Sequence, residues 1–191
     1  MSTFYNKQFT LKEFYHHTDL AIRSNKDFRM AMKENLISKT FKEELMLAVT
    51  EINGCELCNV YHTKNLEVQK QSDSSVGGII LKKVHFATTK EDIAMAFAKH
   101  YAGNNGNFNQ TEWDKLCQSY DQKTAYGILG VIRTIMVGNA YGIAIGSLGK
   151  RLRFKPIKNS RFLHEAAISI GVVLMLPLVA IKNLILKPSI I

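Results

Sequence analysis

Two long apolar segments in the C-terminal half limit what this 191-residue chain can fold into. Residues 125–149 carry a single charged side chain, and residues 166–181 carry none. Segments this apolar must be removed from water, either inside a protein core or in a membrane. The first segment also repeats Gly138, Gly142 and Gly146 at four-residue spacing, as small residues do where helices pack closely in membranes.

Burial inside the protein is favoured over a topology with two membrane spans. The second segment has only 16 residues, which is short for a span. If both segments crossed a membrane, residues 150–161 would face the side opposite a cytosolic N-terminal region, against the positive-inside tendency. We therefore expect buried core helices and close packing in an oligomer, with membrane contact as the less favoured alternative.

The positive charge of the chain is concentrated in one short stretch. The formal net charge is +9, and residues 101–191 supply +7 of it from 11 basic and 4 acidic side chains. Six basic residues lie within twelve positions, namely Lys150, Arg151, Arg153, Lys155, Lys158 and Arg161. A solvated loop is the favoured interpretation, although such a cluster can also bind anionic lipid or an acidic partner. Nucleic acid is not expected, because Phe154 is the one aromatic residue in the stretch.

The cysteine content and the first residues indicate a cytoplasmic protein. Three cysteines are too few, and odd in number, for the disulfide framework of a secreted domain. The first residues, MSTFYNKQFTLKEF, have no basic region followed by an apolar run, so no signal peptide is predicted. The length fits one domain of ordinary size.

Helix signals recur along the chain and predict a single all-α domain over residues 1–191. Four Ser/Thr-x-x-acid pairs have the spacing of a capping box, namely Thr10 with Glu13, Ser24 with Asp27, Thr40 with Glu43, and Thr88 with Glu91. The domain divides into N-terminal helices over 1–40, helices that carry two cysteines over 41–71, and C-terminal helices over 79–191 with a basic loop at 150–161.

A helix break precedes the two neighbouring cysteines. Asn53 and Gly54 predict the end of one helix, because both residues tolerate positive φ, and the next helix begins at Cys55. Further elements are expected as a short strand or helix turn over 79–86 and as helices over 90–101, from Thr111, over 122–148 and over 160–186, with a kink at Pro177.

The segment CELCNVYH, residues 55–62, carries the chemically informative pattern. On one helix Cys55, Cys58 and His62 share a face. Cys55 lies at the helix N-terminus, where free amides and the helix dipole stabilise a thiolate. His62, one turn beyond Cys58, can accept or relay a proton. Two thiols at this spacing can also close a disulfide where the geometry permits, so the residues are the parts of a thiol redox centre.

Other interpretations of these residues stay open. The cysteine pair can be half of a zinc site, with His62 as a third ligand and Cys117 or His100 as a fourth, although no spacing favours this. A thioredoxin-type motif would follow a strand, whereas a helix precedes this pair. Glu43 can be a member of a capping box with Thr40 and nothing more. Cys117 is expected to be a small buried apolar side chain.

The segment EELMLAVTEINGCELCNVYH resembles the signature of the carboxymuconolactone decarboxylase / alkylhydroperoxidase D-like family. In that signature a glutamate lies twelve residues ahead of the first cysteine of NGC-x-x-C-x-x-x-H, and the matching residues here are Glu43, Asn53, Gly54, Cys55, Cys58 and His62. The resemblance covers about twenty residues and is accompanied by the helical pattern of the whole chain. It implies an all-α fold that assembles into trimers or hexamers.

The resemblance also implies a role for each chemical group. Cys58 would attack a hydroperoxide and Cys55 would resolve the product as a disulfide. His62 and Glu43 would relay protons, and a dithiol reductant would restore the thiols, with no cofactor or metal. One departure is Leu57, where peroxidase members of the family place a histidine, so full peroxidase efficiency is not implied.

Three other functions remain as alternatives to the peroxidase. They are a general CxxC thiol–disulfide oxidoreductase, a non-catalytic module of the family fold that binds a partner or a membrane surface, and a zinc-stabilised module. The lactone-decarboxylase branch of the family typically lacks the cysteine pair, so its activity is less expected here.

Overall fold

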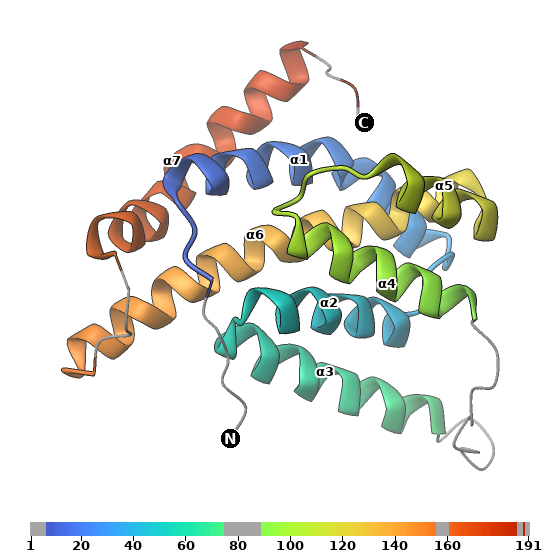
Figure 1. Cartoon of the computed structure of the whole chain (residues 1–191), viewed down its shortest axis with the longest axis horizontal. Coiled ribbons are helices and arrows are strands. Elements are labelled where there is room, and N and C mark those ends of the chain that lie inside the picture. The colour runs from blue at the N-terminus through green and yellow to red at the C-terminus, as the bar shows by residue number, and fades with distance from the viewer. Residues whose placement is uncertain (1–6, 75–88, 156–160, 187–188, 190–191) are drawn as a thin grey trace.

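The computed structural model describes residues 7–74, 89–155, 161–186 and 189 of the chain. Within these residues every regular element is a helix, which confirms the predicted all-α class. In chain order the helices are α1 (Leu11–Lys33), α2 (Lys39–Asn53), α3 (Glu56–Ser74), α4 (Lys90–Gly103), α5 (Gln110–Ser119), α6 (Gln122–Leu152) and α7 (Phe162–Leu186) (Figure 1). The strand or helix turn expected over residues 79–86 lies outside the described residues.

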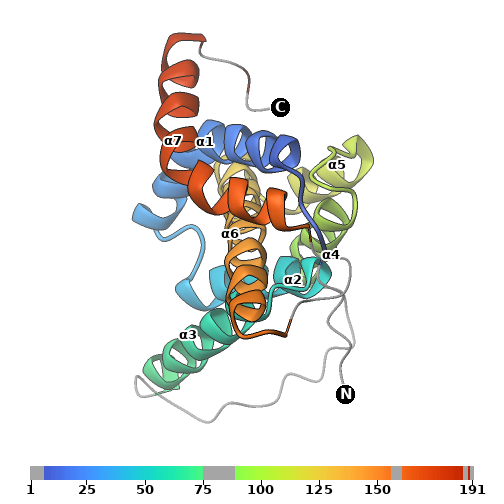
Figure 2. The ribbon, with the colours of Figure 1, turned by 90° about the vertical axis from the view of Figure 1, so that its left-hand side faces the viewer.

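Helix α6 is the element around which the other helices pack. It contacts α1 to α5 and α7, and two perpendicular views show it running through the middle of the molecule (Figures 1 and 2). Glycines let α1 approach it, because a Cβ on Gly127 would lie 2.4 Å from the Cβ of Ala31 and one on Gly130 would lie 2.8 Å from the Cβ of Phe28. The expectation of a buried core helix is confirmed here, since 67% of the most apolar window of α6 is buried.

Helix α7 does not meet the same expectation. In this chain only 11% of its most apolar window is buried, and side chains such as Ile170 and Val173 are exposed. It packs against α1 and α6, where Ile168 and Val179 are buried. The prediction that this chain buries α7 is wrong. An apolar sequence shows that the side chains avoid water, but it does not show that residues of the same chain cover them. Both α6 and α7 are long and apolar enough to cross a membrane.

Polar contacts hold both ends of α7 on the rest of the chain. Near its end, Lys182 Nζ and Asn183 Nδ2 donate to Asp19 Oδ1 of α1 at 2.9 and 2.8 Å. Near its start, the buried carboxylate of Glu165 accepts a hydrogen bond from Arg151 of α6 at 3.5 Å. Figure 2 shows the helix turning between these ends, and it contains Pro177, which cannot donate a backbone hydrogen bond.

The capping signal at Thr10 is confirmed, whereas the one at Ser24 is wrong. The amide of Thr10 donates to Glu13 Oε2 at 2.8 Å and the amide of Glu13 donates to Thr10 Oγ1 at 3.2 Å, which begins α1. Ser24 lies in the middle of the same helix. Its hydroxyl accepts a hydrogen bond from Arg133 of α6 at 2.8 Å. The hydroxyl therefore joins α1 to α6 and does not cap the start of another helix.

Helix α4 begins at Lys90, as the sequence predicted, but its capping box lies one residue after the expected Thr88–Glu91 pair. Thr88 lies outside the described residues. The observed capping box joins Thr89 and Asp92, with each backbone amide bonded to the other side chain.

The basic stretch at residues 150–161 is helical at its start, which corrects the predicted loop. Helix α6 continues to Leu152 and has Lys150 and Arg151 in its last turn. Basic side chains interact favourably with the carbonyl end of a helix, so they prolong α6 rather than break it. Residues 156–160 lie outside the described residues.

His17 is a buried histidine on α1. Its ring packs edge-on against Phe9 with the centroids 5.7 Å apart, and a Cβ on Gly106 would lie 3.0 Å from its Cε1 atom. Burial, with smaller effects of His16 and Lys7, lowers the pKa of His17 to about 4. The imidazole is therefore neutral in the folded chain at neutral pH.

We expect the free energy of unfolding to decrease as the pH falls from 6.5 to about 4. In this window the unfolded chain binds a proton at His17 and the folded chain does not, so acid favours the unfolded state. The loss due to His17 reaches at most about 3 kcal/mol. Urea unfolding across this range measures it. His17→Leu should make the free energy of unfolding depend less on pH in this range, whereas His100→Gln, at an exposed histidine, should not. An unchanged pH dependence in His17→Leu would contradict the lowered pKa of His17.

Candidate redox site

The turn between α2 and α3 places two cysteines at the start of a helix. Gly54 ends α2 at φ 70°, a left-handed conformation that favours glycine, as the sequence predicted. Its amide donates to the carbonyl of Thr50 at 2.8 Å. Helix α3 then begins at Glu56, so Cys55 lies directly before its first turn and Cys58 lies within that turn.

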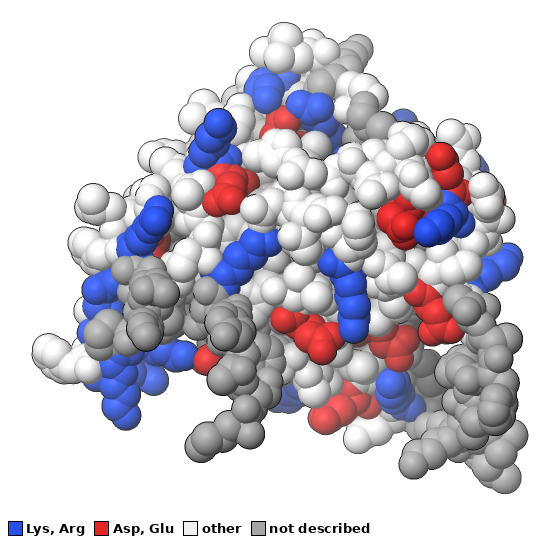
Figure 3. Space-filling model, in the orientation of Figure 1, with Lys and Arg blue, Asp and Glu red and all other residues white. Residues whose placement is uncertain are grey.

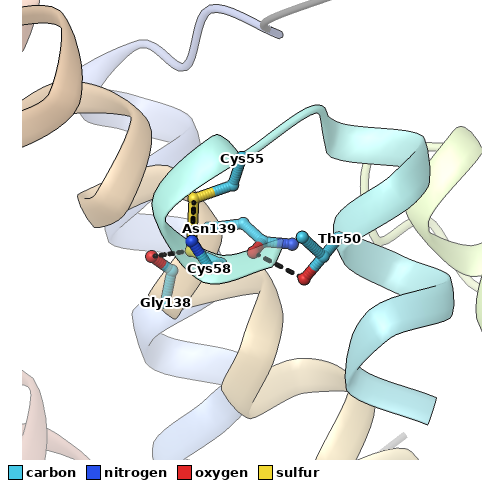
Figure 4. The surroundings of a disulfide bond; sticks show 5 residues. All are labelled: Thr50, Cys55, Cys58, Gly138 and Asn139. Carbon is cyan, nitrogen blue, oxygen red and sulfur yellow. Dashed lines mark hydrogen bonds between the residues drawn. A yellow bond between two sulfur atoms is a disulfide. The ribbon is translucent and has the colours of Figure 1, made fainter. Parts of the chain in front are cut away.

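Cys55 and Cys58 form a disulfide, with their Cα atoms 5.3 Å apart (Figure 4). This separation is ordinary for a disulfide. The two residues differ in burial, because Cys55 is fully buried and Cys58 is half-buried. Cys58 is therefore the more exposed residue of the pair.

Helix α6 forms the wall against which the sulfur atoms pack. The sulfur of Cys58 lies 3.5 Å from the carbonyl oxygen of Gly138 (Figure 4). One turn further on, a Cβ on Gly142 would lie 2.7 Å from the sulfur of each cysteine, so glycine is needed for this approach. The glycine spacing in the sequence predicted a close helix contact, and the partner is the disulfide of α3.

A buried hydrogen bond joins α2 to the same part of α6. Thr50 Oγ1 donates to Asn139 Oδ1 at 3.0 Å, and both side chains are fully buried (Figure 4). On the next turn of α2, Asn53 Nδ2 donates to the sulfur of Met136 at 3.2 Å. Paired polar groups in a core specify one register of the helices, and they thereby position the turn that carries Cys55.

Glu43 of α2 and His62 of α3 form a buried pair. His62 Nδ1 lies 2.7 Å from Glu43 Oε2, and Lys42 Nζ donates to Glu43 Oε1 at 2.7 Å. Burial acts to raise the pKa of Glu43, but hydrogen bonds and charge from Lys42 and His62 outweigh it and lower the pKa. Because an ionised carboxylate only accepts hydrogen bonds, the Nδ1 atom of His62 carries a proton and Nε2 is left as the basic nitrogen.

The alternative in which Glu43 caps its own helix is wrong. The cap of α2 is Ser38, whose hydroxyl accepts a hydrogen bond from the amide of Phe41 at 3.0 Å. Helix α2 consequently starts before Thr40, and Glu43 lies beyond its first turn. The carboxylate is then available to the neighbouring helix.

Helix α3 connects the disulfide with the buried Glu43–His62 pair. Cys58 and His62 are four residues apart on it, so their side chains project from one face. The arrangement offers a half-buried cysteine, a second cysteine that closes a disulfide, and a base oriented by a carboxylate. Lys42 was not predicted as part of the site. Gly142 was not predicted as its wall either, although the glycine spacing contained the signal.

A pocket of about 300 Å³ lies between α3 and α6, next to the turn of α6 that packs on the disulfide, and neither cysteine lines it. Leu57 and Ile143 supply apolar lining, and so does Gly142, which touches the sulfur atoms. Lys150 and Arg153 line it where α6 ends. The volume is at the lower end of the range for small-molecule sites.

The described residues contain no group of three or more His, Cys, Asp and Glu side chains that could hold a metal ion. His100, considered above as a zinc ligand, lies on α4 and contacts Asn104 at 2.7 Å. Cys117 is exposed on α5 rather than buried as predicted. Trp113 and Leu116 take the side of α5 that faces the core, and Cys117 is rotated away from it.

We expect Gly142→Ala to destabilise the chain by about 1–3 kcal/mol and to favour reduction of the disulfide, because the new methyl group requires both sulfur atoms to move. Urea unfolding and thiol–disulfide equilibration with glutathione measure the two effects.

Gly138→Ala is the matched control. A Cβ at this position makes only an ordinary 3.5 Å contact with Ile135, so the gain in helix propensity should raise stability by up to about 1 kcal/mol. Similar effects of the two substitutions would contradict the close contact of Gly142 with the sulfur atoms.

Comparison of the chain with protein-family models, with curated proteins and with solved structures finds no match of any of these three kinds. The function of the site is accordingly argued from the chemistry of its residues.

Proposed function

We propose that the chain is a thiol-dependent peroxidase of the carboxymuconolactone decarboxylase / alkylhydroperoxidase D-like family. It reduces hydroperoxides through Cys55 and Cys58, with Glu43 and His62 as a proton relay. One observation carries the proposal. On α3 the half-buried Cys58 of the disulfide is followed one turn later by His62, whose ring is hydrogen-bonded to the buried carboxylate of Glu43 at 2.7 Å.

Cys58 is the peroxidatic residue in this mechanism. It is the half-buried member of the pair, whereas Cys55 is fully buried. The Cys58 thiolate attacks the terminal oxygen of the hydroperoxide, a sulfur–oxygen bond forms and the O–O bond breaks. The sulfur is oxidised to a sulfenic acid, and the organic part leaves as an alcohol once its oxygen takes a proton.

Cys55 resolves the sulfenic acid. Its sulfur lies 3.3 Å from the backbone amide of Cys58 at the start of α3, which favours the thiolate form in the reduced pair. The Cys55 thiolate attacks the sulfur of the Cys58 sulfenic acid, the S–S bond forms, and the S–O bond breaks. The leaving hydroxide takes up the proton that the Cys55 thiol gave up and becomes water. Attack by an external dithiol then reduces the disulfide and returns both thiols.

His62 and Glu43 supply the proton that the leaving oxygen needs. The imidazole takes the proton of the reacting thiol and later gives it to the leaving oxygen. Glu43 holds Nδ1 of the ring, and Lys42 keeps that carboxylate ionised. The pair is thus oriented before substrate arrives, which is the condition for efficient proton transfer.

The apolar pocket between α3 and α6 favours organic hydroperoxides as substrates. Leu57, which replaces the histidine of other family members, borders this pocket, so the position supplies apolar contact in place of a second base. The need for a dithiol reductant places the proposed activity in the cytoplasm. A homo-oligomer, a trimer or a hexamer, is part of the proposal on the strength of the resemblance.

Turnover of an organic hydroperoxide with a dithiol reductant tests the proposal. Cys58→Ser should abolish turnover. Cys55→Ser should leave a single oxidation and a sulfenic acid that a dimedone-type reagent traps and mass spectrometry detects. Unchanged turnover in Cys58→Ser would refute the mechanism, and so would disulfide exchange in the wild type without peroxide consumption.

Glu43→Gln tests the relay. The amide can no longer hold an imidazolium by charge, so we expect the rate of peroxide reduction to fall by roughly 10- to 100-fold, with disulfide formation in a chemical oxidant unchanged. Glu44→Gln is the matched control, because Glu44 is the next residue of the same helix and pairs with Lys70 at 3.2 Å, away from His62. Equal losses in both variants would contradict a specific role of Glu43.

A further inference from the structure

The α6–α7 corner, which we define as residues 150–155 and 161–163, exposes large apolar side chains. Leu152, Phe154 and Leu163 are 81%, 95% and 79% exposed. Single exposed apolar residues are common on proteins, but bulky ones at the end of α6 and at the start of α7, two segments that Arg151 and Glu165 join, indicate an interaction surface.

The backbone at this corner favours glycine but carries Phe154. The amides of Phe154 and Lys155 donate to the carbonyls of Arg151 and Lys150 at 3.0 and 2.9 Å, which is the Schellman pattern of a helix end. Phe154 occupies the left-handed position of that pattern at φ 57°, where a bulky side chain is strained. Its ring is almost wholly exposed, so it contributes little to the packing of the chain and indicates a role outside it.

Basic side chains surround the apolar ones. Figure 3 shows Lys and Arg atoms gathered at the lower left of the molecule, where Figure 1 places the end of α6. In the described part of the corner these residues are Lys150, Arg151, Arg153, Lys155 and Arg161. Lys150 pairs with Glu56 and Arg151 with Glu165, whereas the other three are exposed and form no ion pair with an acidic residue that the structure describes.

We propose that the α6–α7 corner docks on the surface of an anionic lipid bilayer. The apolar side chains insert at the boundary of headgroups and acyl chains, and the Lys and Arg side chains contact lipid phosphates at the same depth. A bilayer fits this surface better than a second copy of the chain, because two such corners in contact would bring their positive charges together.

Helix α7 lies along the bilayer in this arrangement and does not cross it. The bonds from Lys182 to Asp19 and from Arg151 to Glu165 attach both of its ends to the rest of the chain, and a spanning helix would lose them. Its exposed side chains, such as Ile170, continue the apolar surface that begins at the corner.

Cosedimentation with lipid vesicles tests the docking. The full chain is used with the Cys55–Cys58 disulfide closed and with no peroxide or reductant present. We expect binding to vesicles of phosphatidylcholine mixed with phosphatidylglycerol, and at least tenfold weaker binding to phosphatidylcholine alone. A Lys or Arg near an anionic surface strengthens binding about fivefold, so the reversal Arg153→Glu with Lys155→Glu should also weaken it at least tenfold.

Phe154→Gly separates a docking role from a structural one. Glycine relieves the backbone strain, so the melting temperature should stay the same or rise, while vesicle binding weakens at least tenfold because the ring is lost. Val68→Ser is the matched control. Val68 is an exposed apolar residue in the second half of α3, away from Glu56 at the start of that helix, which pairs with Lys150 of the corner. This variant should bind like the parent chain.

Three outcomes would overturn the docking proposal. They are a parent chain that does not bind the mixed vesicles, a Phe154→Gly variant that binds them undiminished, and self-association without vesicles that Phe154→Gly abolishes in light scattering. The last result would assign the corner to a second copy of the chain. Peroxide turnover in solution is measured without vesicles, so none of these outcomes bears on the proposed peroxidase.

Discussion

The close approach of α6 to the disulfide is the contact on which the rest of the site depends. Gly142 lets the backbone of α6 lie directly against both sulfur atoms, and the hydrogen bond between Thr50 and Asn139 holds α2 in register with the same turns. The glycine at the α2–α3 turn then determines where α3 starts. Small residues on α6 and at the α2–α3 turn thus set the position of the disulfide and of the start of α3.

The charges of the site depend on one another in a similar way. A buried carboxylate by itself would tend to be neutral, but Lys42 and His62 lower the pKa of Glu43 and keep it ionised. The ionised Glu43 in turn selects the tautomer of His62 and fixes the plane of its ring. Removing Lys42 or His62 therefore takes away an interaction that lowers the pKa of Glu43.

Most of the candidate site could be predicted from the sequence because its residues lie within short separations on two helices. Cys55, Cys58 and His62 fall on one face by helical periodicity alone, whereas the partnership of Glu43 with His62 came from the family resemblance. The wall of the site could not be predicted, because Gly138 is 80 residues from Cys58 and no local pattern pairs the two segments. The cap expected at Ser24 and the burial expected for α7 were wrong for the same reason, since tertiary contacts decide both.

The two cysteines of the disulfide differ in burial, and this difference makes their sulfur atoms unequal as targets for another thiol. In the proposed cycle an external thiol attacks the sulfur of the less buried Cys58, so Cys55 is the leaving thiolate, and the amide 3.3 Å away stabilises it as it departs. Any mixed disulfide, whether with glutathione or with another protein, consequently forms on Cys58 beside a thiolate that can expel it. In the proposed cycle the buried cysteine thereby acts as a release group that frees the chain from a covalent adduct.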